Sequence, residues 1–180
     1  MKSGNYWHDV EVGKEAPKVL NVIIEIPKDS QNKYELDKET GLLKLDRVLY
    51  SAVYYPGDYG FVPQTLCGDG DPLDVLILSN RPVYPLTLTE VRILGVMKMI
   101  DNNEQDDKLI GVYKSDPRFK QFQSIKDVPN HTLEEIKHFF ETYKQLQGKQ
   151  CKVLEILDKD SAYKEIENAK KLYSQKFKKK

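Results

Sequence analysis

The sequence predicts an α+β fold, a small, mostly antiparallel β-barrel (OB-like) with flanking C-terminal helices. Short, β-branched apolar segments recur from residue 19 onward between clusters of turn residues, whereas helical periodicity appears only near the end of the chain. The 180 residues are enough for one sizeable core, and neither an internal repeat nor a low-complexity linker divides them. We therefore expect a single domain over residues 1–180.

The predicted strands begin with VLNVIIEIP at 19–27, which is apolar, β-branched and ended by a proline. The segment KYELDKETGLLKLDRVLY alternates on both sides of Glu39-Thr40-Gly41, a pattern typical of a hairpin. The prolines and glycines of VYYPGDYGFVP predict an irregular, rigid loop. Further strands are predicted at 73–79, 90–100, 108–113 and 151–157.

Two amphipathic helices are predicted near the end of the chain, packed on the outside of the barrel. The first spans 130–148, beginning with a capping box of Thr132 and Glu135 and ending at Gly148. Its expected buried face comprises Leu133, Ile136, Phe140 and Tyr143. The second spans 161–177, with an expected buried face of Ala162, Ile166, Ala169, Tyr173 and Phe177.

The composition narrows the class of protein. The 28 basic and 28 acidic residues cancel, so no net field favours nucleic acid or an acidic membrane as partner. No apolar run approaches the 18 or so residues of a membrane span, and the first residues lack the apolar region of a secretory signal. Cys67 and Cys151 are too few for a disulfide framework, so we expect buried free thiols and a cytoplasmic location.

The stretch CGDGDPLDVLIL places Asp69, Asp71 and Asp74 directly before an apolar run. Two unit charges about 5 Å apart repel by roughly 3 kcal/mol at an effective dielectric near 20, so a cation must offset them. Gly70 and Pro72 allow the backbone to curl until all three carboxylates surround one point. Oxygen ligands alone favour hard cations such as Mg²⁺ or Mn²⁺. The alternative is a surface turn, which would need only one aspartate.

A second acidic segment, MIDNNEQDDKLIG, links two predicted strands. Taken alone, it is typical of a solvated hairpin loop. Beside the first acidic cluster, it can instead complete a site for several metal ions. Its charged residues are Asp101, Glu104, Asp106, Asp107 and Lys108.

A metal site that handles phosphate should also carry cations and hydroxyl groups. Lys33 and Glu35 share one face of a predicted strand, and Tyr143 and Lys144 lie on the first predicted helix. Each such residue, taken singly, is more often a packing or solvated residue than a ligand. The remaining candidates are Arg47, Tyr54, Tyr55 and Tyr59.

Taken together, these segments resemble the soluble family I inorganic pyrophosphatases. DGDPLD looks like the signature of that family, and the likeness extends in order over most of the chain. The short length resembles the prokaryotic form, which is usually hexameric. The other similar blocks are VIIEIPKDSQNKYELDKETG, DRVLYSAVYYPGDYGFVPQTL, GVMKMIDNNEQDDKLIGV and HFFETYKQLQGK.

The resemblance implies hydrolysis of pyrophosphate to two phosphates with several Mg²⁺ ions, for which Mn²⁺ or a similar ion can substitute. Attack would be in line, by a metal-bound water, with Asp71 as general base. The implied metal ligands are Asp69, Asp74 and Asp106 for a first ion, Asp74 for a second, and Asp101 and Asp106 for an ion that arrives with substrate. The implied phosphate ligands are Lys33, Arg47, Tyr59 and Tyr143, supported by Lys108 and Lys144, with Glu25, Glu35 and Tyr55 in the outer part of the site.

Two positions depart from the family pattern. The family commonly has a second acid after the aspartate that matches Asp101, and here that residue is Asn102. A second helix histidine often seen in the short form is Thr142 here, after His138. From the resemblance we expect a homo-oligomer, with a hexamer favoured. Because of Thr142, we expect its subunit interface to differ in detail from that of the short family form.

Two other functions remain open from the sequence. A small barrel with aromatic residues such as those at 54–59 could bind single-stranded nucleic acid, although the balanced charge and the clustered aspartates oppose this. The acidic residues would also suit an enzyme that acts on a larger phosphoanhydride, such as a nucleoside triphosphate. The sequence shows neither a P-loop nor a base pocket for such a substrate.

Overall fold

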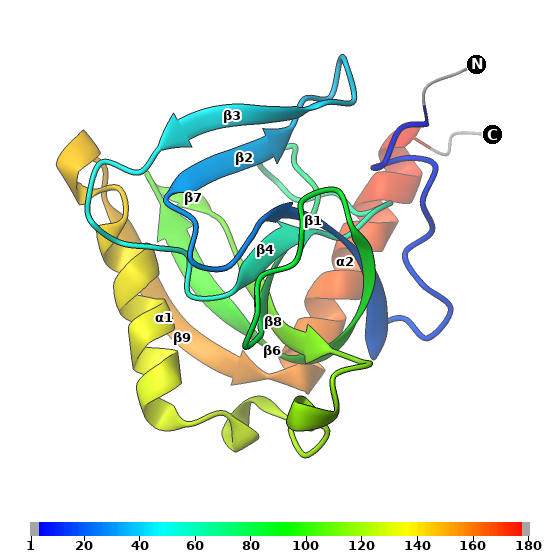
Figure 1. Cartoon of the computed structure of the whole chain (residues 1–180). Helices are drawn as coiled ribbons and strands as arrows, with labels where there is room; N and C mark the ends of the chain where they lie inside the picture. Colours follow the sequence, from blue (N-terminus) through cyan, green and yellow to red (C-terminus); the bar gives the residue numbers. More distant parts are fainter. Residues whose placement is uncertain (1–3, 178–180) are drawn as a thin grey trace.

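The computed structural model describes residues 4–177, which form a closed, five-stranded barrel with a helix on each of two sides (Figure 1). The first barrel strand also pairs with the last, which closes the sheet. One neighbouring pair, β5–β8, is parallel and the other barrel pairs are antiparallel, so the predicted mostly antiparallel barrel is confirmed. In spatial order the barrel strands are β1 (Val19–Ile26), β4 (Asp58–Phe61), β5 (Asp74–Leu78), β8 (Lys108–Tyr113) and β6 (Leu88–Asp101).

Three further pieces extend this barrel. The predicted hairpin forms as a separate two-stranded sheet at the top of the view in Figure 1, with Gly41 at a φ of 71° in its turn. The long strand β6 runs on beyond the barrel and pairs there with two further strands. These elements are β2 (Asn32–Leu36), β3 (Leu43–Val48), β7 (Glu104–Gln105) and β9 (Cys151–Asp158).

The apolar side chains of the strands pack into two separate buried clusters. In β5, Leu76 and Leu78 pack into a cluster that includes the first helix, whereas Val75 and Ile77 pack into a cluster that includes the second. Because successive side chains of a strand point to opposite faces, an unbroken apolar run is what a strand covered on both faces requires. The carboxylate stretch therefore leads directly into β5, whose residues after Asp74 are all buried.

The two helices pack on the outside of the barrel as predicted, but the first is shorter. The helix α1 (Asn130–Thr142) begins after Pro129, whose carbonyl accepts the N–H of Thr132, so the predicted capping box at Thr132 is wrong. After α1 a short 3₁₀ helix leads to Gly148, at a φ of 69°. Tyr143 and Lys144 thus follow the helix instead of lying on it. The other helices are η1 (Pro117–Phe119), η2 (Ile125–Asp127), η3 (Gln145–Gln147) and α2 (Lys159–Phe177).

The strand β4 was not predicted, because its segment looks like a loop by composition. Gly60 allows the close pairing, since a Cβ there would lie 2.0 Å from the Ile23 carbonyl oxygen. The fully buried carboxylate of Asp58 at the start of β4 accepts bonds from the hydroxyls of Ser79 and Tyr113, at 2.8 and 2.7 Å. Tertiary contacts therefore override the turn propensity of this segment.

Three smaller expectations need correction or comment. Phe177 is 40% exposed at the end of α2 instead of buried, although its ring contacts that of Trp7 with a centroid distance of 5.3 Å. Cys67 and Cys151 are free thiols as predicted, but each is half-buried instead of buried. No helix within residues 4–177 combines the length and the apolar character needed to cross a bilayer.

Candidate active site

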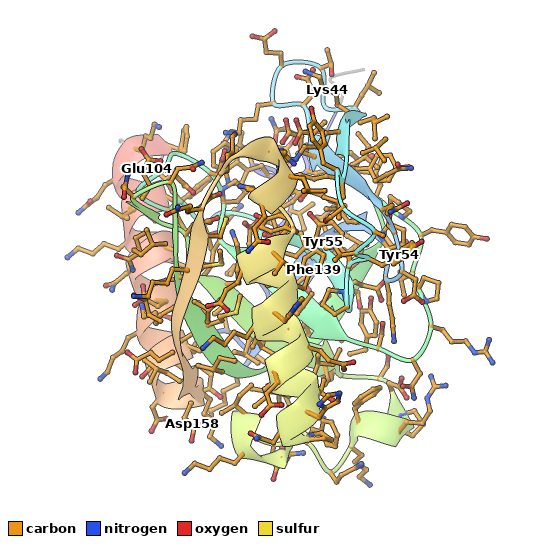
Figure 2. All side chains as sticks on the ribbon, turned by 90° about the vertical axis from the view of Figure 1, so that its left-hand side faces the viewer. Lys44, Tyr54, Tyr55, Glu104, Phe139 and Asp158 are labelled. Atoms are coloured by element: carbon orange, nitrogen blue, oxygen red, sulfur yellow. The ribbon has the colours of Figure 1, made fainter. Side chains whose placement is uncertain are left out.

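A cavity of about 810 Å³ lies where the β2–β3 hairpin faces the acidic segments of the barrel. All of the site residues that the family resemblance implies line this cavity except Arg47 and Tyr55. Lys44 and Glu104, which also line it, lie at the upper end of the view in Figure 2. The structure therefore brings together carboxylates, lysines and tyrosines from segments that are far apart in the sequence.

The first acidic segment curls at Gly70, but within residues 4–177 its three carboxylates do not gather closely enough to surround one ion, contrary to the expectation. Asp69, Asp71 and Asp74 all line the cavity, and Gly70 between them has a φ of 90° that suits glycine. The N–H of Asp71 donates to the Asp69 carboxylate at 2.9 Å, and the N–H of Cys67 donates to the Asp71 carbonyl at 2.7 Å. The segment is thus a turn, but one that directs three carboxylates to a common cavity.

The second acidic segment divides between the cavity and the surface. Asp101 and Asp106 are part of the cavity wall, and the exposed strand β7 (Glu104–Gln105) forms its outer edge, whereas Asp107 lies outside the cavity. Lys144 pairs with Asp101. Asp107 instead pairs with Lys98, at 2.6 Å. The hypothesis of a simple solvated hairpin is therefore insufficient for Asp101 and Asp106.

Lys108 is the buried cation of the cavity, with 3% of its side chain exposed. Its Nζ pairs with Asp106 and lies 2.6 Å from Asp74, which also accepts the Tyr59 hydroxyl at 2.6 Å. Burial alone would lower the pKa of Lys108, but the two carboxylates outweigh it and raise the pKa above its ordinary range. Lys108 therefore stays charged at any physiological pH.

A second basic group lies on the hairpin. Asp46 accepts from Lys33 at 3.1 Å and from Arg47 Nη1 at 2.6 Å, and Lys33 also pairs with Glu35 at 3.2 Å. Arg47 Nε and Nη2 are buried and have no hydrogen-bond partner within the described residues. Unpaired buried donors are costly, so this guanidinium has capacity for a further acceptor. An oxyanion is the acceptor that suits it best.

Tyr55 supports the site from behind. Its ring is buried, 5.5 Å from that of Tyr59 and 4.9 Å from that of Phe139, between centroids. Figure 2 shows Tyr55 beside Phe139 and Tyr54 directed away from them. Tyr55 thus fixes the position of Tyr59, and Tyr54 is 53% exposed and takes no part in the cavity.

Comparison with known proteins decides the family. The model of the inorganic pyrophosphatase family matches residues 22–174. The chain belongs to this family. It is 51% identical to soluble inorganic pyrophosphatase 3 of Arabidopsis thaliana, over 94% of this chain and 78% of that protein.

Solved structures of bacterial members of the pyrophosphatase family have the same fold. The inorganic pyrophosphatase of Thermus thermophilus has a TM-score of 0.92 and 46% identity, over 95% of this chain and 99% of that chain. The pyrophosphatase of Helicobacter pylori has a TM-score of 0.87 and 48% identity, over 92% of this chain and 98% of that chain. The resemblance to the short form of the family is therefore confirmed.

Membership of the pyrophosphatase family implies a requirement for divalent metal ions, and the donor chemistry of the cavity fits it. Within residues 4–177 no three His, Cys, Asp or Glu side chains gather closely enough to hold an ion by themselves. The carboxylates pair with lysines instead: Lys108 lies between Asp74 and Asp106, Lys144 pairs with Asp101, and Lys38 pairs with Asp71. The assignment of individual metal ligands stays a prediction.

The two departures from the family pattern have local explanations. Asn102 and Asn103 form the two-residue turn between β6 and β7, with φ values of 48° and 71°. Two successive positive φ values are typical of a type I′ turn, which favours asparagine and glycine. Thr142 ends α1, where its hydroxyl donates to the His138 carbonyl at 2.7 Å.

Lys38 and Asp46 also belong to the site, although the sequence did not indicate them. Lys38 Nζ pairs with Asp71 and lies 5.3 Å from the ring centroid of Trp7, which also lines the cavity. Asp46 joins Lys33 to Arg47. Both residues look like solvated charges of a hairpin. The one signal that could have indicated them is their proximity in the folded chain to Asp71, Lys33 and Arg47.

Glu25 is the buried carboxyl of the cavity. It is 8% exposed and accepts the Leu36 N–H at 2.7 Å. Burial, followed by the charge of Asp74, raises the pKa of Glu25 to about 8. A raised carboxyl pKa means that the folded protein holds this proton more tightly than the unfolded chain. Its contribution to stability is therefore present at low pH and is lost as the pH rises towards 8.

Glu25→Gln should accordingly remove a pH-dependent cost of folding. Between pH 5 and pH 8 in EDTA, the free energy of unfolding of the variant should rise relative to wild type by on the order of 3 kcal/mol, given the pKa of about 8. Urea denaturation at both pH values measures this. A difference between variant and wild type that does not change with pH would contradict the assigned pKa.

Proposed function

We propose that this chain hydrolyses inorganic pyrophosphate to two phosphates, with Mg²⁺ as the divalent cation. The observation that carries the proposal is one cavity in which carboxylates from two separate acidic segments alternate with lysines. Such an arrangement suits a highly charged anion that binds together with cations. The membership in the inorganic pyrophosphatase family supports the same substrate.

The basic and phenolic residues are proposed to bind the two phosphoryl groups. Lys33 and Lys144 line the cavity with their charges partly satisfied by carboxylates. Arg47 does not line it, but two of its nitrogens, Nε and Nη2, have no hydrogen-bond partner within the described residues. The Tyr143 hydroxyl adds a neutral donor at the same cavity, whereas the Tyr59 hydroxyl donates to Asp74 and would have to release that carboxylate to donate to a phosphate. Lys and Arg side chains offset the negative charge that would otherwise repel an attacking oxygen nucleophile.

The metal ions are proposed to bind the carboxylates Asp69, Asp74, Asp101 and Asp106. Bound there, they would offset the charge of the substrate and increase the acidity of water. Lys108 holds Asp74 and Asp106 next to each other, so two of these ligands are already close. Mn²⁺ or a similar hard cation could substitute, because the ligands are all oxygen.

Asp71 is proposed to be the general base. Its carboxylate lines the cavity, and its side chain is 55% exposed, so water can reach it. Lys38 pairs with one of its carboxylate oxygens. The proton of the nucleophilic water would pass to this carboxylate as the oxygen attacks phosphorus in line with the leaving phosphate.

Phosphate release from pyrophosphate tests the function. The wild-type protein is expected to release two phosphates per pyrophosphate in Mg²⁺ and to lose this activity in excess EDTA. Parallel assays with ATP distinguish an enzyme for larger phosphoanhydrides, and a salt titration of oligonucleotide binding distinguishes a nucleic-acid module. Folded protein that releases no phosphate from pyrophosphate in Mg²⁺ or Mn²⁺ would overturn the proposal.

The assembly and location are proposed from the same family resemblance. We infer a homo-oligomer, with a hexamer favoured, in the cytoplasm. Exposed apolar side chains on and after β3 are compatible with a subunit contact. They are Leu45, Val48, Tyr50 and Tyr54, each half or more exposed in the chain by itself.

A further inference from the structure

The adjacent carboxylates Asp106 and Asp107 face different cavities. Asp106 lines the active-site cavity together with its partner Lys108. Asp107 lines a second cavity of about 450 Å³, which is formed with α2 and the segment around Cys67. Asp107 therefore does not reach the proposed metal site, yet it is joined by one peptide bond to a proposed ligand.

Asp107 holds the acidic turn with three hydrogen bonds. Its carboxylate accepts the backbone N–H of Met99 at 3.2 Å, Lys98 Nζ at 2.6 Å and Gln105 Nε2 at 2.6 Å. Lys98 Nζ also donates to Glu165 of α2 at 2.5 Å. Only 7% of the Asp107 side chain is exposed, so the bonds from Met99 and Lys98 are partly shielded from water, whereas the bond from Gln105 is exposed. The turn is thereby connected to the helix.

One of these bonds replaces a missing bond of the sheet. Strand pairing between β6 and the returning chain is interrupted between the pairs Ile100–Gln105 and Met97–Lys108. Asp106 N–H still donates to the Met99 carbonyl at 3.0 Å. In a regular antiparallel ladder Met99 N–H would return a bond to Asp106. It instead donates to the carboxylate of Asp107.

We propose that Asp107 is a positioning residue that sets the backbone of Asp106, and through β6 that of Asp101, for divalent cations. Lys98 and Glu165 fix Asp107 in turn. This inference rests on the proposed function of the same site. Outer partners that orient metal ligands typically contribute 10–100-fold to metal affinity. The competing interpretation is that the three charges only attach α2 to the barrel.

Three variants separate these interpretations. Asp107→Ala removes both the bond to Met99 and the charge, whereas Asp107→Asn keeps an oxygen for the Met99 N–H. Glu165→Gln leaves Asp107 intact and weakens only its support. Glu167→Gln is the matched control, since it removes an exposed ion pair with Lys170 on the same helix. The full chain of each variant is studied.

Two measurements are made on each variant. Calorimetric titration gives the Kd for Mn²⁺, and amide hydrogen exchange by NMR in EDTA gives the protection of the Met99 N–H. Asp107→Ala should weaken Mn²⁺ binding about 10–100-fold and should speed Met99 exchange. Asp107→Asn should retain Met99 protection and lose less affinity. Glu165→Gln should show a smaller loss in the same direction, and Glu167→Gln should match wild type.

Mn²⁺ affinity in Asp107→Ala equal to that of wild type would overturn the proposal, even if the variant were less stable. Weakened Mn²⁺ binding with unchanged Met99 protection would also overturn it. If Asp107→Ala does not fold, wild-type affinity in both Asp107→Asn and Glu165→Gln has the same meaning. Pyrophosphate hydrolysis by wild type is assayed separately, so a failure of the proposed function is distinguished from a failure of this inference.

Discussion

Asp71→Asn is expected to fold, to bind Mn²⁺ like the wild type and to lose about 10²–10⁴-fold in kcat for pyrophosphate. The amide has the shape of the carboxylate but cannot accept a proton at neutral pH. Asp71 lies at the rim of the cavity with half of its side chain exposed, and it supports no buried strand directly. Its main partner is Lys38, on the hairpin.

The turnover number is measured by phosphate release at saturating pyrophosphate and Mg²⁺. Asp37→Asn is the matched control, because Asp37 also lines the cavity but its carboxylate accepts from its chain neighbours, the N–H groups of Glu39 and Thr40. That variant should stay close to wild type, since an asparagine oxygen can accept the same bonds. Wild-type turnover in Asp71→Asn would remove Asp71 from the mechanism.

The strands of the barrel were predictable where burial on both faces leaves a long apolar run. β1, β5 and β8 are of this kind, and their bounds agree with the sequence to within a residue or so. The strand β4 was not predictable, because Gly60 is needed for a contact with β1 that only the folded chain contains. Local composition shows that the segment is rich in turn-forming residues. It does not show that Gly60 must pack closely against the backbone of another strand.

The residues of the site likewise divide into those that could be predicted from the sequence and those that could not. Asp69, Asp71 and Asp74 stand out because three charges before a core strand need an explanation. Asp107 does not, since a charge in a hairpin segment is ordinarily solvated. Its role depends on the register of β6 against the returning chain and on the position of Glu165 in α2. Registers and helix docking are tertiary features, so sequence spacing alone does not contain them.

Lys108→Met should lower the free energy of unfolding in EDTA by about 3–5 kcal/mol, because it leaves Asp74 and Asp106 close together without their buried cation. Methionine is unbranched and only one heavy atom shorter than lysine, so the loss of stability would come more from the missing charge than from a cavity. The nearby Tyr59 hydroxyl, which donates to Asp74, offsets only part of this cost.

Addition of Mg²⁺ should then stabilise Lys108→Met more than it stabilises wild type. A cation that binds the folded protein stabilises it in proportion to the logarithm of its concentration over Kd. Removal of the competing ammonium group should lower that Kd. Urea denaturation with and without Mg²⁺ measures both effects, and Lys114→Met is the control, because its ion pairs with Glu15 and Glu90 are exposed. If Lys108→Met in EDTA were as stable as Lys114→Met, the prediction would be wrong. Lys108 would then not be needed to offset the repulsion between Asp74 and Asp106. A loss that Mg²⁺ reverses would instead show that the lysine and the divalent cation neutralise the same pair of charges.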